Sequence, residues 1–123
     1  MKICIVHVDR IAREVLSRAL QRSFDAEVLT YACCEDALLA FLGCDVFVVY
    51  NNFGPRKMNG IKGVAAVRAQ NPRAFIIGVS SKPYNQRRFL PAGANAFLLR
   101  AGNEIGELVG IIDRWQKQPV RVG

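Results

Sequence analysis

Short apolar runs alternate with amphipathic segments along the chain. Residues 2–6 (KICIV) are hydrophobic at nearly every position, which is typical of a parallel strand covered on both faces. Asp9 can cap the segment that follows, where apolar residues recur at helical spacing: Ala12, Val15, Leu16, Ala19 and Leu20. These two segments predict a buried strand followed by a helix with one apolar face.

The same alternation continues as far as Trp115. Residues 26–32 predict an edge strand, and residues 35–42 predict a short helix that ends at Gly43. That helix is expected to turn three apolar side chains toward the core: Leu38, Phe41 and Leu42. Three further apolar runs predict strands at 45–50, 74–80 and 96–99.

Three further amphipathic segments predict the remaining helices. The first runs over 61–70 and the second over 83–92, where Pro91 should keep the helix short or irregular near its end. Asn103 is predicted to cap the last helix, whose apolar side comprises Ile105, Leu108, Val109 and Ile112.

Five strands that alternate with five helices predict an α/β fold, with an open, doubly wound parallel sheet, helices on both faces and right-handed crossovers. In such sheets, ligands bind at the carboxyl ends of the strands, near the point where the strand order reverses. In this chain that edge comprises His7 to Asp9, Tyr50 to Asn52, Ser80 to Lys82, and Arg100.

The composition fits one domain. With 123 residues, 51% of them hydrophobic, the chain is expected to form a single domain over residues 1–116. Residues 117–123 have no core-forming pattern and are interpreted as a C-terminal tail or the start of a linker to an output domain. No apolar run approaches the roughly 20 residues needed to cross a bilayer, and the N-terminus has no signal-peptide pattern, so a cytoplasmic location is expected.

The cysteines and the net charge indicate no specific ligand by themselves. The four cysteines lack C-x-x-C spacing and the chain has a single histidine, so no metal site is expected and the thiols should be reduced and mostly buried. The net charge of +7 comes without the aromatic residues of a single-stranded RNA motif. We interpret it as a solvated basic surface, with a nucleic-acid-binding accessory role as the alternative.

Three segments carry a resemblance to a known family. AGANAFLLR (92–100) is similar to a family pattern Ala-Gly-Ala-Asp-Gly-Tyr-Leu-Leu-Lys, while KICIVHVDRIAREVL at the start and CDVFVV leading into MNG match in order and spacing. Together they resemble the receiver domain of bacterial two-component response regulators (CheY-like domains), over nearly the whole chain. The resemblance implies a flavodoxin-like, five-stranded parallel sheet in the order 2-1-3-4-5 with five helices.

The resemblance also implies an activity whose key residues are replaced here. Receiver domains take a phosphoryl group from a histidine kinase onto an Asp at the end of the third strand, with Mg²⁺ held by that Asp and an acidic pair after the first strand. The alignment places Tyr50 at the phosphoaccepting position, or Asn52 when counted back from Gly60, and neither is a carboxylate. His7 and Val8 stand at the acidic pair, with Asp9 one step further on.

Two other positions of the implied pocket are retained. Ser80 and Arg100 match the Ser/Thr and Lys that contact the phosphoryl oxygens. Mg²⁺ requires near-octahedral oxygen ligands, which His7, Val8 and Tyr50 do not provide. We therefore expect a degenerate phosphorylation pocket, no Mg²⁺, no cofactor and no enzymatic activity. Ala101 replaces the family's proline after the lysine position, which predicts a trans peptide between residues 100 and 101.

Two side chains of this pocket have alternative interpretations. His7 could be a proton-coupled switch because histidine titrates near neutral pH, but a packed, hydrogen-bonded role is the plainer interpretation. Tyr50 could be a ligand contact, but its ring is expected to plug the vacated acidic pocket. Phosphate acceptance through Asp9 remains a further alternative.

The edge of the predicted sheet is basic where the family concentrates negative charge. The residues that could hold a small anion, a nucleotide or a partner's carboxylate are Arg56, Lys57, Lys82 and Arg100. The alternative is that these side chains bind no ligand and that solvent screens the repulsion between their charges.

A partner surface is implied on the fourth helix, fifth strand and fifth helix. Phe97 matches an aromatic position of the family's fifth strand, and the surface would include Arg87, Arg88 and Trp115. Core packing of Phe97 is the alternative. We expect an atypical, phosphorylation-independent receiver that acts as an interaction or dimerisation module in bacterial signalling and regulates an attached or partner output domain.

Overall fold

The computed structural model describes residues 1–40 and 42–118. The predicted inward packing of Phe41 and most of the predicted tail, residues 119–123, therefore lie outside the described residues.

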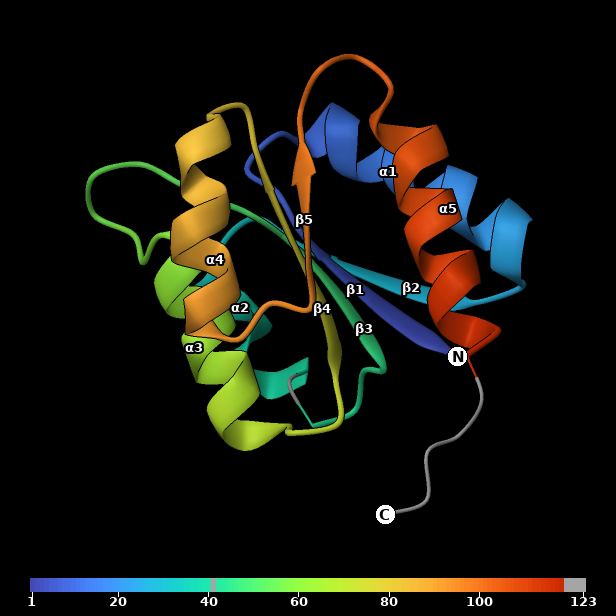
Figure 1. The fold of residues 1–123 in the computed structure, drawn as a ribbon, viewed down its shortest axis with the longest axis horizontal. Helices are drawn as coiled ribbons and strands as arrows, with labels where there is room; N and C mark the ends of the chain where they lie inside the picture. Colours follow the sequence, from blue (N-terminus) through green and yellow to red (C-terminus); the bar gives the residue numbers. More distant parts are fainter. Residues whose placement is uncertain (41, 119–123) are drawn as a thin grey trace.

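The strands form one five-stranded parallel sheet in the order β2-β1-β3-β4-β5, which confirms the order that the family resemblance implies (Figure 1). The three central strands are almost wholly buried: β1 (Lys2–Val6), β3 (Val46–Tyr50) and β4 (Phe75–Ser80). The edges are β2 (Glu27–Tyr31) and β5 (Ala96–Leu99), whose residues are more exposed. The near-continuous apolar sequence of the central strands follows from burial on both faces.

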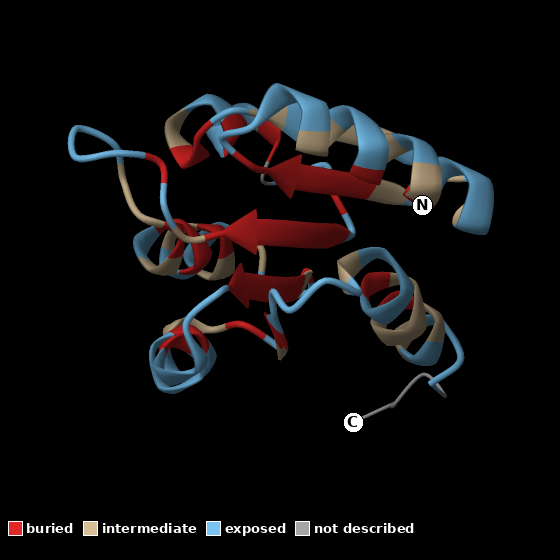
Figure 2. Cartoon of the chain, turned by 90° about the horizontal axis from the view of Figure 1, so that it is seen from above, coloured by how far each residue is buried: buried red, intermediate tan, exposed pale blue. Residues whose placement is uncertain are grey.

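Helices cover both faces of this sheet and make a three-layered molecule (Figures 1 and 2). On one face lie α1 (Arg10–Phe24) and α5 (Glu104–Gln116). On the other face lie α2 (Cys34–Ala37), α3 (Gly60–Gln70) and α4 (Gln86–Ala92). Short 3₁₀ turns follow α2 at Leu38–Ala40 and precede α4 at Pro83–Asn85. No helix of the described residues is long and apolar enough to span a membrane.

The two predicted helix caps behave differently. The Asp9 side chain accepts a hydrogen bond from the Ile11 N–H at 2.9 Å, so Asp9 caps α1 as predicted. Asn103 occupies the corresponding place before α5, but its side chain makes no capping hydrogen bond. Its backbone (φ −121°, ψ 39°) departs from the extended conformation typical of a capping residue, so that part of the prediction is wrong.

The predicted helix at 35–42 is wrong in its length and in its buried face. The α-helical part stops at Ala37 and tightens into a 3₁₀ turn, which changes the angular spacing of the side chains. Leu38 and Leu42 are consequently 40% and 75% exposed. The buried positions are small ones, Cys34, Ala37 and Ala40.

All four cysteines are free and buried, in agreement with the sequence interpretation. Burial raises the pKa of the Cys34 thiol to about 12, so this group is a packed thiol at neutral pH rather than a reactive thiolate.

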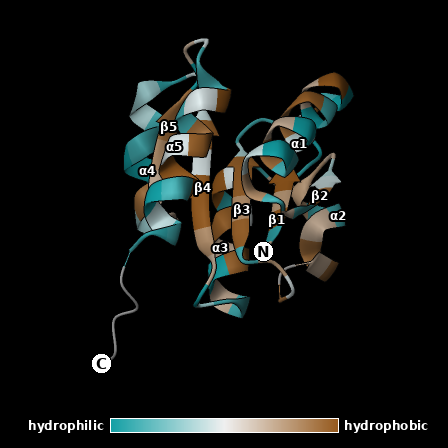
Figure 3. Cartoon of the chain, turned by 90° about the vertical axis from the view of Figure 1, so that its right-hand side faces the viewer, coloured by the Kyte–Doolittle hydropathy of each residue, from teal (hydrophilic) through white to brown (hydrophobic). Residues whose placement is uncertain are grey.

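The helix α4 is short and is held to the sheet mainly by one aromatic side chain. Phe89 is fully buried and packs over Gly78 of β4, where an added Cβ would lie only 2.4 Å from the Phe89 ring. The helix ends at Ala92, one residue after Pro91, as the proline predicts. Most of its remaining surface is hydrophilic (Figure 3).

The helix α5 packs with only part of its predicted apolar side. Leu108 and Ile112 are fully buried, whereas Ile105 is 38% exposed because it lies in the first turn, at the edge of the sheet.

Candidate functional site

The carboxyl ends of β1, β3, β4 and β5 meet around a cavity of about 350 Å³. This is the edge that the sequence singles out, and nine of the ten residues of that edge line the cavity: His7, Val8, Tyr50, Asn51, Asn52, Ser80, Ser81, Lys82 and Arg100. Asp9, Arg56 and Lys57 are not among the lining residues. The loop after β3 returns to this edge, where the Gly60 N–H donates a hydrogen bond to the Asn51 carbonyl at 2.9 Å. The two backbone segments are so close there that a Cβ on residue 60 would collide with the backbone of Tyr50.

His7 is buried at the end of β1, with only 3% of its surface exposed. Its Nδ1 accepts a hydrogen bond from the Asp9 N–H at 3.0 Å, so the neutral imidazole carries its proton on Nε2. Within the described residues, Nε2 has no hydrogen-bond partner. Burial, and then the nearby Arg100 charge, lower the pKa of His7, so the ring is neutral at neutral pH.

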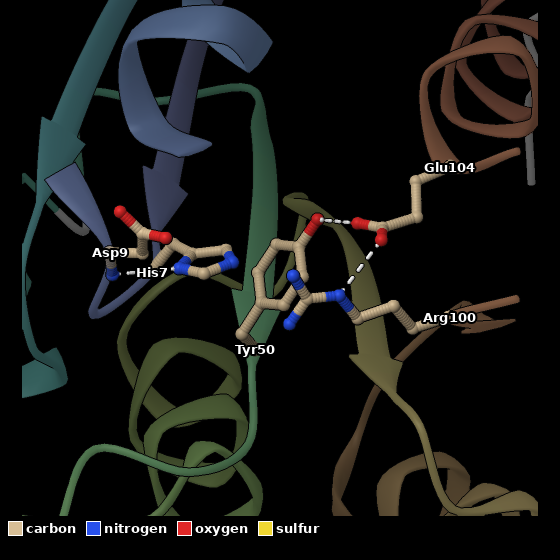
Figure 4. Close-up of polar contacts among 5 residues, drawn as sticks. All are labelled: His7, Asp9, Tyr50, Arg100 and Glu104. Atoms are coloured by element: carbon tan, nitrogen blue, oxygen red, sulfur yellow. Dashed lines mark hydrogen bonds and ion pairs between the residues drawn. The ribbon is translucent and has the colours of Figure 1, made fainter. Parts of the chain in front are cut away.

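Tyr50 lies with its ring against His7, at a distance of 4.0 Å between ring centroids (Figure 4). Only 5% of its surface is exposed. The hydroxyl donates to Glu104 Oε2 at 2.5 Å. Burial and this hydrogen bond raise the pKa of Tyr50, so the phenol stays protonated. Its ring and hydroxyl therefore occupy the space at the end of β3.

Glu104 joins this site, although the sequence interpretation does not include it. Its other oxygen, Oε1, accepts from Arg100 Nε at 2.9 Å, and the Arg100 guanidinium carbon lies 5.8 Å from the centre of the Tyr50 ring (Figure 4). The available signal is the i, i+4 spacing of Arg100 and Glu104, which predicts an ion pair. Nothing in that spacing indicates the contact with Tyr50.

Ser80 is held by the segment that leads into α4. Its Oγ accepts hydrogen bonds from the Lys82 N–H at 3.0 Å and from Asn85 Nδ2 at 2.8 Å. Asn85 is buried, and its Oδ1 accepts from Arg88 Nη1 at 3.3 Å. Arg88, predicted as an interface residue, thus also lines the cavity.

The other predicted basic residues lie apart from the cavity. Arg56 and Lys57 are exposed in the loop between β3 and α3. Glu35 accepts a hydrogen bond from the Met58 N–H at 2.9 Å, and this bond, with help from the Lys57 charge, lowers the pKa of Glu35. Lys57 therefore interacts electrostatically with Glu35 and does not line the cavity at the strand ends.

The residues at this edge do not fit Mg²⁺. Val8 contributes only its carbonyl, which accepts from Arg13 Nη1, and the Asp9 carboxylate caps α1. The Tyr50 hydroxyl is bonded to Glu104. In the part of the chain that the structure describes, no group of three or more His, Cys, Asp or Glu side chains could hold a metal ion. The described side chains at this edge therefore do not form the carboxylate set that Mg²⁺ prefers.

The peptide between Arg100 and Ala101 is trans, as predicted, since no described peptide bond is cis.

The predicted partner surface combines packed and exposed residues. Phe97 is half-buried against Phe89, with ring centroids 5.9 Å apart, and Trp115 stacks on Phe75 at 5.1 Å. Arg87 and Arg88 are exposed on α4. Beside them, a groove of about 520 Å³ runs along β5 and α5, lined by Phe97, Leu98, Leu99, Glu107, Gly110 and their neighbours.

No protein-family model and no curated protein matches the sequence. The fold, in contrast, matches many solved structures. The BeF₃-activated receiver domain of DrrB superposes with a TM-score of 0.83 at 20% identity, covering 95% of this chain and 97% of that one. The chemotaxis protein CheY4 of Vibrio cholerae superposes with a TM-score of 0.79 at 26% identity, covering 92% and 96%.

A longer protein contains the same fold as one part. The response regulator DrrB, an OmpR/PhoB homologue of Thermotoga maritima, superposes with a TM-score of 0.81 at 20% identity, covering 94% of this chain and 52% of that one. The chain therefore has the fold of the receiver domains of response regulators in two-component signalling.

Proposed function

We propose that this chain is a receiver-type signalling domain that works without phosphorylation and without catalysis, as a protein interaction or dimerisation module. One observation carries the proposal. At the end of β3, where the resemblance implies the phosphoaccepting Asp, the chain has Tyr50, or Asn52 when counted back from Gly60, and Tyr50 is buried, protonated and bonded to Glu104. A phosphodonor would meet no free carboxylate at the end of β3.

The chemistry of phosphoryl transfer supports the same conclusion. Such transfer depends on a positioned nucleophile and on cations that neutralise the charge of the transition state. The carboxylate nearest to the family's acidic pair is Asp9, and it is bonded to the N-terminus of α1. Arg100, which matches the family's Lys, is bonded to Glu104. Each retained group is thus committed to a contact within the protein.

The partner that the surface favours is a second copy of the chain. The groove along β5 lies at an edge of the sheet, where backbone groups of an edge strand are open to a partner. Basic residues on α4 and Glu107 on α5 flank this edge, so a two-fold arrangement can bring opposite charges together. Association there would transmit a signal through the face formed by α4, β5 and α5 to an attached or partner output domain.

Phosphorylation is tested by incubating the protein with acetyl phosphate and MgCl₂ and measuring its intact mass. We expect no increase in mass, because neither Tyr50 nor Asp9 is available as an acceptor. The Asp9→Asn variant is the matched control. A mass increase of one phosphoryl group that disappears in this variant would identify Asp9 as the acceptor and overturn the proposal.

A further inference from the structure

Several hydrogen-bond donors line the cavity at the carboxyl edge of the sheet, beside the apolar side chains of Val8 and Val79. Four asparagines (Asn51, Asn52, Asn59 and Asn85) and two serines (Ser80 and Ser81) line it, and Oδ1 of Asn51 is a buried acceptor without a partner among the described residues. The Oδ1 atoms of Asn52 and Asn59 accept from the N–H groups of Gly54 (3.2 Å) and Lys62 (2.9 Å), which leaves their NH₂ groups free to donate. Ser80 Oγ accepts two hydrogen bonds, which leaves its O–H to donate.

A buried donor without a partner points to a ligand in the same cavity. His7 lines the cavity and is 97% buried, and its Nδ1 is occupied by the Asp9 N–H. The proton is therefore on Nε2, on the side of the ring away from Asp9 (Figure 4). Nε2 has no acceptor among the described residues, whereas buried donors in proteins are almost always paired.

The charges around the cavity are positive. Lys82, Arg88 and Arg100 line it, and no Asp or Glu is among the described residues that do. Glu104 pairs with Arg100 from outside this lining. Lys82 and Arg88 have no carboxylate within ion-pair distance in the described part of the chain. Two cationic side chains and several neutral donors are thus left without an anion.

We propose that this cavity binds, non-covalently, a small molecule that carries two negative charges on oxygen atoms, either a phosphate group or a pair of carboxylates. The volume of about 350 Å³ is within the range of about 300–1,000 Å³ that small-molecule sites occupy. Nε2 of His7, the NH₂ groups of Asn52 and Asn59, and the Ser80 hydroxyl donate to the oxygen atoms. Lys82 and Arg88 neutralise the charge.

Binding would also act on the face formed by α4, β5 and α5. Ser80, Asn85 and Arg88 form a continuous chain of hydrogen bonds from the end of β4 to the first turn of α4. A dianion on Ser80 and Arg88 would order this segment. The site thereby goes beyond the proposed function by adding a ligand that could regulate it.

The test is a titration with potassium phosphate, and separately with succinate, at constant ionic strength and with EDTA present. Binding is followed by calorimetry and by the NMR signals of His7, which is the only histidine of the chain. We expect saturable binding of at least one of the two dianions and a rise in the pKa of His7, because a nearby negative charge stabilises the imidazolium form. The two arms distinguish a phosphate group from a pair of carboxylates.

Variants connect this binding to the cavity. Lys82→Gln and Arg88→Gln should each weaken binding about tenfold, which corresponds to about 1.4 kcal/mol. Both side chains are exposed, so the fold should tolerate these changes. His7→Asn keeps an acceptor for the Asp9 N–H and removes the Nε2 donor, and it should weaken binding similarly. Arg73→Gln, the matched control, removes one exposed charge next to β4 at the opposite edge of the sheet and should have no effect.

Two results would overturn the inference. One is the absence of saturation with either dianion. The other is an equal effect of Arg73→Gln and Arg88→Gln, which would show attraction to the overall charge of +7 only. Because the titration contains neither Mg²⁺ nor a phosphodonor, its failure would leave the phosphorylation-independent function untouched. Covalent phosphorylation, in turn, would be detected only by the mass measurement.

Discussion

Tyr50 connects the end of β3 to two other segments of the molecule. Its ring fills the end of β3 beside His7, and its hydroxyl reaches Glu104 at the start of α5. A carboxylate at this position would face Glu104 and would repel it. The phenol instead donates a hydrogen bond to a charged acceptor, which is among the stronger hydrogen bonds in proteins. The pair Tyr50 and Glu104 thus ties the third strand to the fifth helix.

His7 leads to a prediction about pH. Its pKa in the folded protein is below the value of about 6.5 that histidine has in an unfolded chain. As the pH falls below about 6.5, the unfolded state takes up a proton before the folded state does, so the free energy of unfolding should decrease. The slope for one group is at most about 1.4 kcal/mol per pH unit. Urea denaturation between pH 5 and pH 7 measures it.

The His7→Asn variant is the control for this dependence. Since His7 is the only histidine, the free energy of unfolding of the variant should be nearly flat over that range. An equally steep dependence in both proteins would assign the effect to carboxylates and contradict the prediction. Arg100 and Arg13 lower the pKa of His7, while Asp9 and Glu104 raise it, so the direction reflects burial together with the two arginines.

Among the elements, α4 depends on a single close contact. It has seven residues, and Phe89 is its only buried side chain. The ring of Phe89 lies where any side chain on Gly78 would have to be. Glycine at residue 78 is therefore required for the close approach of α4 to β4.

Replacing Gly78 with alanine should destabilise the protein. The added Cβ would lie 2.4 Å from the Phe89 ring, and overpacking of this kind costs about 1–3 kcal/mol. Urea denaturation measures this loss, and faster amide exchange in α4 would locate it. Gly43→Ala is the matched control, because a Cβ there meets only one atom, at 4.0 Å, and the change should be neutral or slightly stabilising. Equal stability of the two variants would contradict the prediction.

For the whole molecule, the layered fold leaves β5 as an edge strand between α4 and α5 (Figure 1). The groove there is open partly because Gly106 and Gly110 of α5 have no side chains. The proposed partner surface is thus formed by three elements together, and α4, which contributes to it, also supplies Arg88 to the cavity.

Gly110→Leu tests dimerisation through this groove. An added Cβ meets only the Arg114 side chain, at 3.4 Å, so the leucine would project into the groove and block a partner. The helix should gain about 0.5–1 kcal/mol, because glycine is unfavourable in a helix interior. Sedimentation equilibrium should therefore show weaker self-association of a more stable monomer.

Ala69→Leu is the matched control for that experiment, since residue 69 is exposed on α3, away from β5. It should leave self-association unchanged. A wild-type protein that remains monomeric at high concentration would contradict the choice of a second copy as partner. Equal self-association of the two leucine variants would show that the interface lies elsewhere on the molecule.

The periodicity of the sequence determined the elements and their order. Apolar runs and amphipathic segments are local properties of the sequence. A strand that is buried on both faces has an almost continuous apolar sequence, so the central strands and the edge at which they end could be predicted. The prediction was wrong where local geometry changed, as in the 3₁₀ turn that exposes Leu38. The sequence also shows a tyrosine at residue 50, where the resemblance implies a carboxylate.

Only the tertiary structure decided which side chains meet. Tyr50 and Glu104 are 54 positions apart, and no periodic pattern relates residues so distant. The unpaired Nε2 of His7 likewise depends on which atoms surround the ring after folding. A residue's tendency to form a helix or strand depends on its neighbours in the chain. The partner of a buried polar atom depends on the packing of separate segments, which brings together groups whose spacing in the sequence carries no information.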